Sequence, residues 1–308
     1  MHMDENTKID LSVKLGSLEF ENPVIAASGT FGYGLEFAPF VDLNLLGGFC
    51  TKGLSLKPRV GNPAPRMIET ASGMLNAIGL ENIGLKNFLN EKVPSLEKYQ
   101  SRLIVNFFGD TVTEYVEMAN ALSHVKRIDA LEMNVSCPNV EEGGTQFSSD
   151  PEVLHRIVGA VRAVTDKFLI VKLSPNVTDI TEMALSAEEA GADALSLVNT
   201  HVGMKIDVES GKPWLANTTG GLSGPAIKPM ALAMVYKTVR AVKIPVIGIG
   251  GIASVEDALE FLIAGASAIQ IGTANFIDPS ITIKVIHGLR EYCQGKGLKS
   301  LADLKIVE

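Results

Sequence analysis

Eight short apolar runs rich in β-branched residues recur along the chain, and amphipathic stretches separate them. Most of the runs close on a Gly, Asn, Thr, Ser or Lys residue, as expected of strands that end in polar loops. The runs begin at Pro23, Gly47, Leu103, Ala130, Leu169, Ala194, Ile244 and Ala268. Segments between them, such as 150–164, open with an Asp-Pro pair and carry apolar residues at helical spacing, which predicts a capped helix. The repeated unit is therefore strand, helix, strand.

This alternation indicates a parallel sheet whose outer face is covered by helices. Eight such units in 308 residues predict an α/β fold of the (β/α)8 TIM barrel type, with a doubly wound sheet as the alternative. The barrel is favoured because polar residues follow nearly every strand at its C-terminal end, where barrel enzymes build their sites. We expect one domain over residues 1–308, with barrel strands from about 23 to 274.

Three segments lie outside the repeated unit. Residues 11–20 alternate in period two around Gly16 and Ser17, which predicts an N-terminal β-hairpin that closes the bottom of the barrel. Residues 54–102 and 201–243 are longer than a simple helix crossover requires. Insertions of this kind on the C-terminal face form lids or substrate walls, and we expect that role for both.

The bulk composition narrows the classes of function. A formal net charge of -8 argues against a general nucleic-acid binder, which needs a basic surface. Five histidines without HxH or HExxH spacing argue against a metal bound by protein ligands. The polar start of the chain is unlike a signal peptide, and no later stretch has the pattern of a membrane span. Three scattered cysteines, without a disulfide framework or a CxxC motif, favour a cytoplasmic location.

One apolar run ends abruptly at a thiol. In the stretch 130–139 the strand pattern stops at Cys137, and the proline after it stiffens the following turn. Asn134, Ser136 and Asn139 surround the thiol with neutral donors and acceptors suited to a polar, planar ligand. A thiol at the mouth of such a loop is a candidate base, because orientation and ionisation decide its reactivity. The alternative is a small buried apolar residue.

Residues 248–253 satisfy the pattern GxGxxG/A between a strand and a helical segment, so a Rossmann nucleotide site must be considered. That site needs an acidic residue at the end of the next strand, where residues 271–274 are neutral. A barrel explains the glycines better, because the loops after its seventh and eighth strands bind phosphate through backbone N–H groups. We expect phosphate contacts at Gly250, Gly251, Gly272 and Thr273, with tight turns alone as the alternative.

Lys52 and Lys172 each end an apolar strand, so both side chains are expected to point into the barrel mouth. Burying an ammonium group is costly without an anionic partner. The two lysines therefore indicate an anionic cofactor and an anionic substrate, whereas snorkelling along the rim of the barrel is the alternative.

Seven motifs, taken together and in order, resemble the dihydroorotate dehydrogenase family in its class 1, FMN-dependent form. They are TKG at Thr51, NAIGLEN at Asn76, NVSCPN at Asn134, VKLSPN at Val171, NT at Asn199, GIGGI at Gly248 and IGTA at Ile271. The likeness extends from about Leu11 to the last helix. The stretches that begin at Asn199 and Ser210 resemble the heteromeric, NAD-linked subfamily.

The resemblance implies an FMN-binding barrel that oxidises (S)-dihydroorotate to orotate in de novo pyrimidine (UMP) biosynthesis. In this family a base removes the C5 proton while a hydride passes from C6 to N5 of FMN, and Cys137 matches that base. Neutral amides suit the donors and acceptors of a pyrimidine ring. The positions that match substrate contacts are Lys52, Asn76, Ala77, Ile78, Gly79, Leu80, Asn134, Asn139, Asn199 and Thr200. Those that match FMN contacts are Ser28, Lys52, Gly53, Asn106, Asn134, Lys172, Val198, Gly224, Gly250, Gly251, Gly272 and Thr273.

The same resemblance implies a partner protein. The GxGxxG-like run is assigned to the FMN phosphate, and three scattered cysteines cannot supply the four thiolates of an iron-sulfur cluster. The resemblance therefore implies an electron-transfer subunit with FAD and a two-iron two-sulfur cluster, which passes electrons to NAD within a heterotetramer of two catalytic and two electron-transfer subunits. Three alternatives stay open: another FMN barrel pyrimidine oxidoreductase, the fumarate-linked homodimeric enzyme, and a non-redox barrel that binds a phosphorylated metabolite.

Overall fold

The computed structural model of the chain describes residues 9–136 and 149–307. At its centre, eight parallel strands close into a barrel, and each strand pairs with the barrel strand that follows it in the chain. β16 pairs with β3 and so closes the ring. The strands are β3 (Val24–Ala26), β4 (Gly48–Cys50), β7 (Arg102–Phe107), β8 (Ala130–Asn134), β9 (Phe168–Lys172), β10 (Ala194–Leu197), β15 (Val246–Ile249) and β16 (Ala268–Ile271). Each predicted run overlaps one of these strands, and β7 and β9 begin one residue before the predicted start, so the predicted (β/α)8 fold is confirmed.

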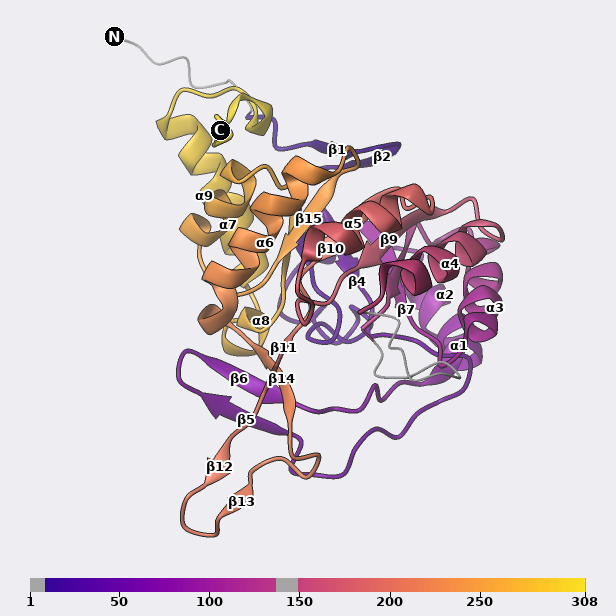
Figure 1. Ribbon diagram of the computed structural model, residues 1–308. Coiled ribbons are helices and arrows are strands. Elements are labelled where there is room, and N and C mark those ends of the chain that lie inside the picture. Colours follow the sequence, from indigo (N-terminus) through magenta and orange to yellow (C-terminus); the bar gives the residue numbers. More distant parts are fainter. Residues whose placement is uncertain (1–8, 137–148, 308) are drawn as a thin grey trace.

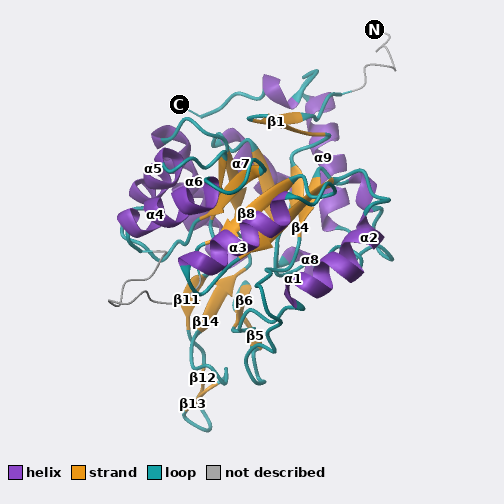
Figure 2. Cartoon of the chain, turned by 90° about the vertical axis from the view of Figure 1, so that its right-hand side faces the viewer, coloured by secondary structure: helices purple, strands orange, loops and turns teal. Residues whose placement is uncertain are grey.

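Helices cover the outside of the barrel (Figure 1, Figure 2). Thr111, Asp150, Asp179 and Ser254 precede four of them, and each side chain accepts a hydrogen bond from a backbone N–H of the first turn. Such caps satisfy donors that a helix leaves without partners. The longer helices are α3 (Val112–Ser123), α4 (Pro151–Arg162), α5 (Ile180–Glu189), α6 (Lys228–Ala241), α7 (Val255–Ile263) and α9 (Ile281–Gly295). The helix predicted within 150–164 is confirmed as α4.

Shorter helical turns fill the remaining connections. Before β7 the chain forms α1 (Gly84–Asn87), η2 (Phe88–Lys92) and α2 (Val93–Leu96) in succession, and α8 (Ala274–Ile277) follows β16. Single turns of tighter helix are η1 (Leu43–Leu45), η3 (Pro225–Ile227) and η4 (Leu301–Asp303). Every helix within residues 9–136 and 149–307 is too short or too polar to span a lipid bilayer.

The barrel wall separates two apolar cores. Outer-face residues such as Val24 and Val105 belong to the core under the helices. Inner-face residues such as Ile25, Ile104 and Ile170 pack together inside the barrel. Side chains alternate between the two faces of a strand, and both faces are covered here, which explains why the strands are apolar almost throughout.

The two long insertions join in one sheet beyond the C-terminal ends of the barrel strands (Figure 1). The first contributes β5 (Met67–Thr70) and β6 (Gly73–Asn76), and the second contributes β11 (His201–Gly203) and β14 (Gly220–Ser223). The strand order is β11-β14-β6-β5, so β14 pairs with β6 across the two insertions. A small ribbon of β12 (Ile206–Asp207) and β13 (Lys212–Pro213) extends from this sheet. Both insertions lie on the predicted face.

The predicted N-terminal hairpin is formed by β1 (Val13–Leu15) and β2 (Leu18–Phe20). Leu15 and Phe20 join the inner core, where they meet the first residues of barrel strands, such as Ala130 and Phe168. The hairpin therefore closes the N-terminal end of the barrel, as predicted. In Figure 1 it lies at the opposite end of the barrel from β5 and β6.

Candidate active site

The predicted site residues gather at one rim of the barrel because they end, or directly follow, parallel strands. The C-terminal ends of such strands meet at a single face. In chain order these positions are Ser28, Lys52, Gly53, Asn106, Asn134, Lys172, Val198, Asn199, Thr200, Gly250, Gly251, Gly272 and Thr273.

A buried carboxylate lies among these residues, and the sequence alone did not point to it. Glu132 projects from β8 and is fully buried. It accepts hydrogen bonds from Gln270 Nε2 at 2.6 Å, from Asn106 Nδ2 at 2.7 Å and from Ser196 Oγ at 3.0 Å. The Lys172 Nζ lies 3.6 Å from Glu132 Oε1. Side chains from five of the eight barrel strands therefore meet at this carboxylate.

The surroundings of Glu132 favour its ionised form. Burial acts to raise the pKa of this carboxyl group, but the Lys172 ammonium and the donors Gln270, Asn106 and Ser196 outweigh burial. The pKa of Glu132 is therefore held below its ordinary value. In the sequence, the available signal was a single acidic residue inside an apolar strand pattern.

Lys172 lies where the sequence placed it, at the end of β9, and its side chain is 6% exposed. Its Nζ donates a hydrogen bond to Ser28 Oγ at 3.2 Å. The anionic partner of Lys172 is Glu132 of the same chain. This pairing corrects the argument that an anionic ligand must offset the cost of burying the lysine.

Lys52 stands at the outer part of the rim and is 29% exposed. Its backbone N–H donates to the Gly32 carbonyl at 2.7 Å, and its Nζ lies 3.9 Å from Glu81 Oε2. Glu81 also pairs with Arg66 at 2.6 Å. The alternative, a lysine that snorkels along the rim of the barrel, therefore describes Lys52 better than Lys172. Through Glu81, Lys52 also links the end of β4 to the first insertion.

Two of the predicted amides are hydrogen bonded to each other. Asn199 Nδ2 donates to Asn134 Oδ1 at 3.2 Å, and the Ser136 N–H donates to the same oxygen at 3.1 Å. The Tyr115 hydroxyl donates to the Asn134 carbonyl at 2.7 Å and so fixes the backbone where β8 ends. Within the described part of the chain the buried Ser136 hydroxyl has no hydrogen-bond partner. A buried polar group without a partner fits a site that receives a polar ligand.

The sheet of the insertions brings Asn76 and Thr200 to the same glycine. Asn76 Nδ2 donates to the Gly221 carbonyl at 3.4 Å. A Cβ atom on Gly221 would lie 2.1 Å from Thr200 Oγ1, so only a glycine lets the two segments approach this closely. The pairing of β6 with β14 therefore joins one side of the predicted substrate site to the other.

The predicted substrate contacts Ala77, Ile78, Gly79 and Leu80 follow β6 directly, outside any helix or strand. The Asn62 N–H donates to the Ile78 carbonyl at 3.0 Å. Gly79 and Leu80 both have positive φ angles, of 76° and 59°. These four residues thus continue the chain from Asn76, at the end of β6, to a bend at Leu80.

Gly53 and Val198 complete the rim beside Asn106. A Cβ atom on Gly53 would lie 2.9 Å from Asn106 Oδ1, so this oxygen faces the backbone at Gly53. Val198 is buried, and its N–H donates to the Ile249 carbonyl at 2.9 Å. Cys137 and Asn139, in contrast, lie outside the described residues.

A backbone cradle forms where the loop after β15 meets the start of α6. A Cβ atom on Gly251 would lie 2.8 Å from Lys228 Cβ and 2.9 Å from both Lys228 N and the Gly224 carbonyl oxygen. Gly250 and Gly251 have φ angles of 134° and 75°, which other residues rarely adopt. The α6 N-terminus adds backbone N–H groups and the positive end of the helix dipole, which together suit a phosphate.

Gly272 and Thr273 extend this cradle after β16. Thr273 Oγ1 lies 2.8 Å from Ser223 Oγ of β14, so the loop after β16 reaches the sheet of the insertions. A Cβ atom on Gly272 would have its nearest neighbour, Ala27 Cβ, at 3.6 Å, which leaves space beside the backbone. The four predicted phosphate contacts thus fit an anionic group held by main chain.

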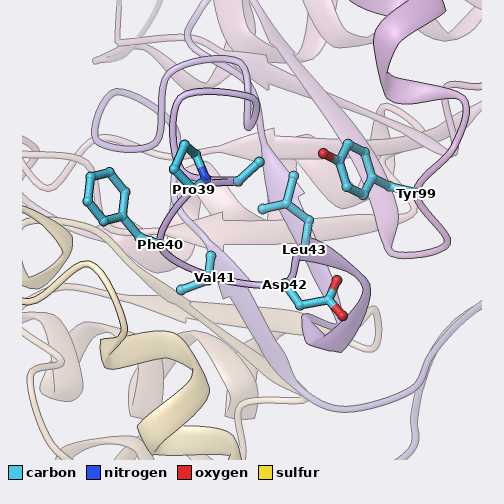
Figure 3. A pocket seen from close by; sticks show the side chains of 7 residues that line it. Pro39, Phe40, Val41, Asp42, Leu43 and Tyr99 are labelled. Atoms are coloured by element: carbon cyan, nitrogen blue, oxygen red, sulfur yellow. The ribbon is translucent and has the colours of Figure 1, made fainter.

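A pocket of about 370 Å³ opens elsewhere on the molecule, lined by residues 38–43 and Tyr99 (Figure 3). Phe40 is 64% exposed there. The lining includes none of the predicted site residues, so this pocket is separate from the rim.

Among the residues that the structure describes, no group of three or more His, Cys, Asp or Glu side chains could hold a metal ion.

Comparison with known proteins assigns the family. The profile of the dihydroorotate dehydrogenase family matches residues 10–293. A protein of Pelobacter propionicus is 57% identical over 96% of this chain and 98% of its own length. Proteins of Trichlorobacter lovleyi and Bacteroides fragilis are 56% and 54% identical, each over 96% of this chain and 97% of the relative. All three bear the name dihydroorotate dehydrogenase B (NAD(+)), catalytic subunit. The chain therefore belongs to the dihydroorotate dehydrogenase family.

Proposed function

We propose that this chain is the catalytic subunit of an NAD-linked dihydroorotate dehydrogenase of the cytoplasm. It oxidises dihydroorotate to orotate in pyrimidine biosynthesis. The observation that carries the proposal is the family match over residues 10–293, together with relatives that share 57% and 56% identity across 96% of the chain and bear this subunit's name. The rim supports it, because paired amides, two lysines and a backbone cradle occupy one barrel mouth.

The proposed cofactor is FMN, and the described residues fit it. When bound, FMN supplies the group that accepts a hydride from the substrate. Gly250, Gly251, Gly272 and Thr273 would hold its phosphate through the main chain. Lys172 would place a fixed positive charge beside it and stabilise negative charge on the reduced form. The other proposed contacts are Ser28, Lys52, Gly53, Asn106, Asn134, Val198 and Gly224.

The proposed substrate site combines neutral amides with one partly exposed cation. Asn134 and Asn199 are oriented by their mutual hydrogen bond before any ligand binds, which lowers the entropic cost of binding. Together with Asn76 they offer the donors and acceptors that a pyrimidine ring requires. Lys52 would pair with the negative charge of dihydroorotate. The remaining proposed contacts are Ala77, Ile78, Gly79, Leu80, Asn139 and Thr200.

Proton removal at C5 of the substrate is assigned to Cys137. The thiol follows the segment in which Asn134 and Ser136 lie at the end of β8. A base must come within hydrogen-bond reach of the proton that it removes, and the rim is the only part of a barrel where a loop residue can meet a ligand held by strand ends.

A second subunit completes the proposed enzyme. We propose that it carries FAD and a two-iron two-sulfur cluster and that two such subunits join two copies of this chain. The term catalytic subunit in the names of the relatives supports a partner. The chain also has only three cysteines, whereas such a cluster usually takes four thiolates, and residues 271–274 lack the acidic residue of a nicotinamide site.

Acceptor specificity tests this proposal. The FMN-loaded chain, supplied with dihydroorotate, should reduce an artificial dye but should barely reduce NAD until the electron-transfer subunit is added. Efficient NAD reduction by the chain alone would remove the need for a partner. Steady turnover with fumarate would assign the chain to the homodimeric enzymes, and turnover with a pyrimidine other than dihydroorotate would change the substrate.

A further inference from the structure

The proposed function gives Glu132 no role, although Glu132 is the most completely enclosed charge described at the rim. Its side chain is fully buried, and its partners come from β7, β9, β10 and β16. A buried carboxylate destabilises the fold unless hydrogen bonds and an opposite charge compensate it. An apolar residue would fill this position without that cost, so the carboxylate calls for a functional explanation.

Two of the four partners are proposed FMN contacts. The Asn106 amide uses Nδ2 to bind Glu132 at 2.7 Å, which leaves Oδ1 facing the backbone at Gly53. The Lys172 ammonium lies between Glu132 Oε1, at 3.6 Å, and Ser28 Oγ, at 3.2 Å. Glu132 therefore fixes which end of the Asn106 amide faces the proposed FMN site. It also fixes the position of the Lys172 ammonium.

The other two partners fasten Glu132 to the inner core. Ser196 Oγ and Gln270 Nε2 both donate to Oε2, and Gln270 Nε2 also lies 3.5 Å from Cys50 Sγ in that core. Oε2 thus accepts hydrogen bonds from neutral groups only, whereas Oε1 accepts a hydrogen bond from Asn106 and lies near the Lys172 ammonium. These neighbours on the core side are uncharged. The charged group nearest to the carboxylate is therefore Lys172, on the side of the proposed cofactor.

We propose that Glu132 is a positioning residue for the cofactor. It orients Asn106 and Lys172, and it balances the Lys172 charge, so that it sets both the affinity for FMN and the preference for reduced over oxidised FMN. The inference rests on the proposed cofactor and goes beyond it, because Glu132 acts through residues that hold FMN.

Glu132→Gln tests the charge. The amide keeps the size of the side chain but leaves the Lys172 ammonium unbalanced, which favours the negative charge of reduced FMN. The FMN-loaded variant should prefer reduced over oxidised FMN at least about tenfold more than the wild type, which raises the two-electron midpoint potential by about 30 mV. A dye-coupled redox titration measures this shift. An unchanged or lower potential in a folded variant would overturn the charge-balancing role.

Glu132→Asp tests the positioning independently. The charge stays in the barrel, but the carboxylate is shorter by one methylene group and loses its reach to Asn106 and Lys172. The dissociation constant of FMN, measured on apo-protein by fluorescence quenching, should rise at least about tenfold. The preference for reduced FMN should change by less than about threefold, and so less than in Glu132→Gln, because a carboxylate still balances the Lys172 charge from a longer distance. Wild-type affinity in this variant would overturn the positioning role.

Ser196→Ala is the matched control. It removes one neutral donor to Glu132 and leaves the contacts to Asn106 and Lys172 in place. The dissociation constant of FMN and the preference for reduced FMN should both stay within about threefold of the wild type, because Gln270 still donates to the same carboxylate oxygen. An effect as large as that of Glu132→Asp would show general loosening of the barrel and overturn the inference. Failure of the wild-type chain to bind FMN would instead refute the proposed cofactor, which separates the two failures.

Discussion

Ionised side chains at the rim are paired within the chain before any ligand binds. Lys172 faces Glu132, and Lys52 faces Glu81, which also holds Arg66. Both lysine side chains therefore have an anionic neighbour within the chain and do not need a bound anion to hold their position. Charges that are already in place stabilise a developing negative charge without reorganisation during the reaction.

Cys137→Ala tests the proposed base. Removal of the thiol should leave FMN bound, because the proposed FMN contacts lie elsewhere, but dihydroorotate should reduce the flavin at least about 10²-fold more slowly, as is typical for a lost general base. Anaerobic stopped-flow absorbance measures this rate, and the FMN content of the purified variant is the control. A near-native rate would exclude Cys137 from the mechanism.

Gly251→Ala tests the phosphate cradle against a matched glycine. Gly251 and Gly297 have similar φ angles, of 75° and 69°, so an alanine is strained by about 1–2 kcal/mol at either position. Only at Gly251 would the new methyl group also enter the cradle, 2.9 Å from Lys228 N. We expect Gly251→Ala to lose FMN on dialysis and Gly297→Ala to keep it, with similar circular dichroism. Equal FMN content in both variants would place the phosphate elsewhere.

The sequence could identify those residues that stand at the end of a predicted strand, because the C-terminal ends of barrel strands face the mouth of the barrel. Lys52, Lys172 and the amides follow apolar runs directly, so their exposure to the barrel mouth could be predicted. Glu132 lies inside such a run, and its partners Asn106 and Gln270 are 26 and 138 positions away. Only the closed barrel brings these positions together, so no local pattern could identify the network.

Among the elements, the N-terminal hairpin contributes to stability rather than to the site. Leu15 is fully buried in the inner core, whereas Lys14 beside it is exposed. Leu15→Ala should lower the free energy of unfolding by about 2–5 kcal/mol through lost burial and a new cavity. Urea denaturation measures this loss, and Lys14→Ala, as the control, should change stability by less than about 1 kcal/mol. A loss below about 1 kcal/mol for Leu15→Ala would mean that the hairpin does not seal the barrel.

The junction between α8 and α9 should give a pH-dependent contribution. Hydrogen bonds from the Lys284 ammonium, at 2.6 Å, and from the Ser280 hydroxyl and N–H lower the pKa of Asp278 to about 2. Because this value lies below the ordinary carboxyl pKa of about 3.9, these interactions stabilise the fold above about pH 4 and are lost as the pH falls toward 2.

Asp278→Asn should therefore destabilise the protein at pH 7 by less than about 1 kcal/mol, since the pair is partly exposed. The difference from the wild type should shrink as the pH falls below about 4. Urea midpoints of both proteins at pH 7 and pH 3 measure it, with Glu97→Gln as the control at another exposed carboxyl. A difference that stays constant between these pH values would contradict the assigned role of the charge.

The sequence predicted where the two insertions lie but not that they pair. Their length and position placed them on the C-terminal face, and that placement is confirmed. The contact between β6 and β14 joins Asn76 to Gly221 across 145 positions. Short strands rich in glycine carry almost no periodic signal, so their partners depend on the geometry of the barrel below them.

For the whole molecule, closure of the barrel unites residues from eight strand ends and two insertions in one mouth. The (β/α)8 fold and the family, predicted from the runs and the seven motifs, are confirmed. The single domain over residues 1–308 and the individual site residues stay predictions. The partner subunit could not be predicted from the barrel pattern itself. It was inferred because the sequence lacks the four thiolates of an iron-sulfur cluster and the acidic residue of a nicotinamide site.

Anaerobic mixing of the purified, FMN-loaded chain with dihydroorotate tests whether this chain oxidises dihydroorotate. We expect the absorbance of oxidised FMN to disappear and orotate to form in an equal amount, without any added acceptor or partner. Dihydrouracil in place of dihydroorotate is the control and should leave the flavin oxidised. An FMN spectrum that dihydroorotate does not bleach would contradict the assignment of this chain as a dihydroorotate dehydrogenase.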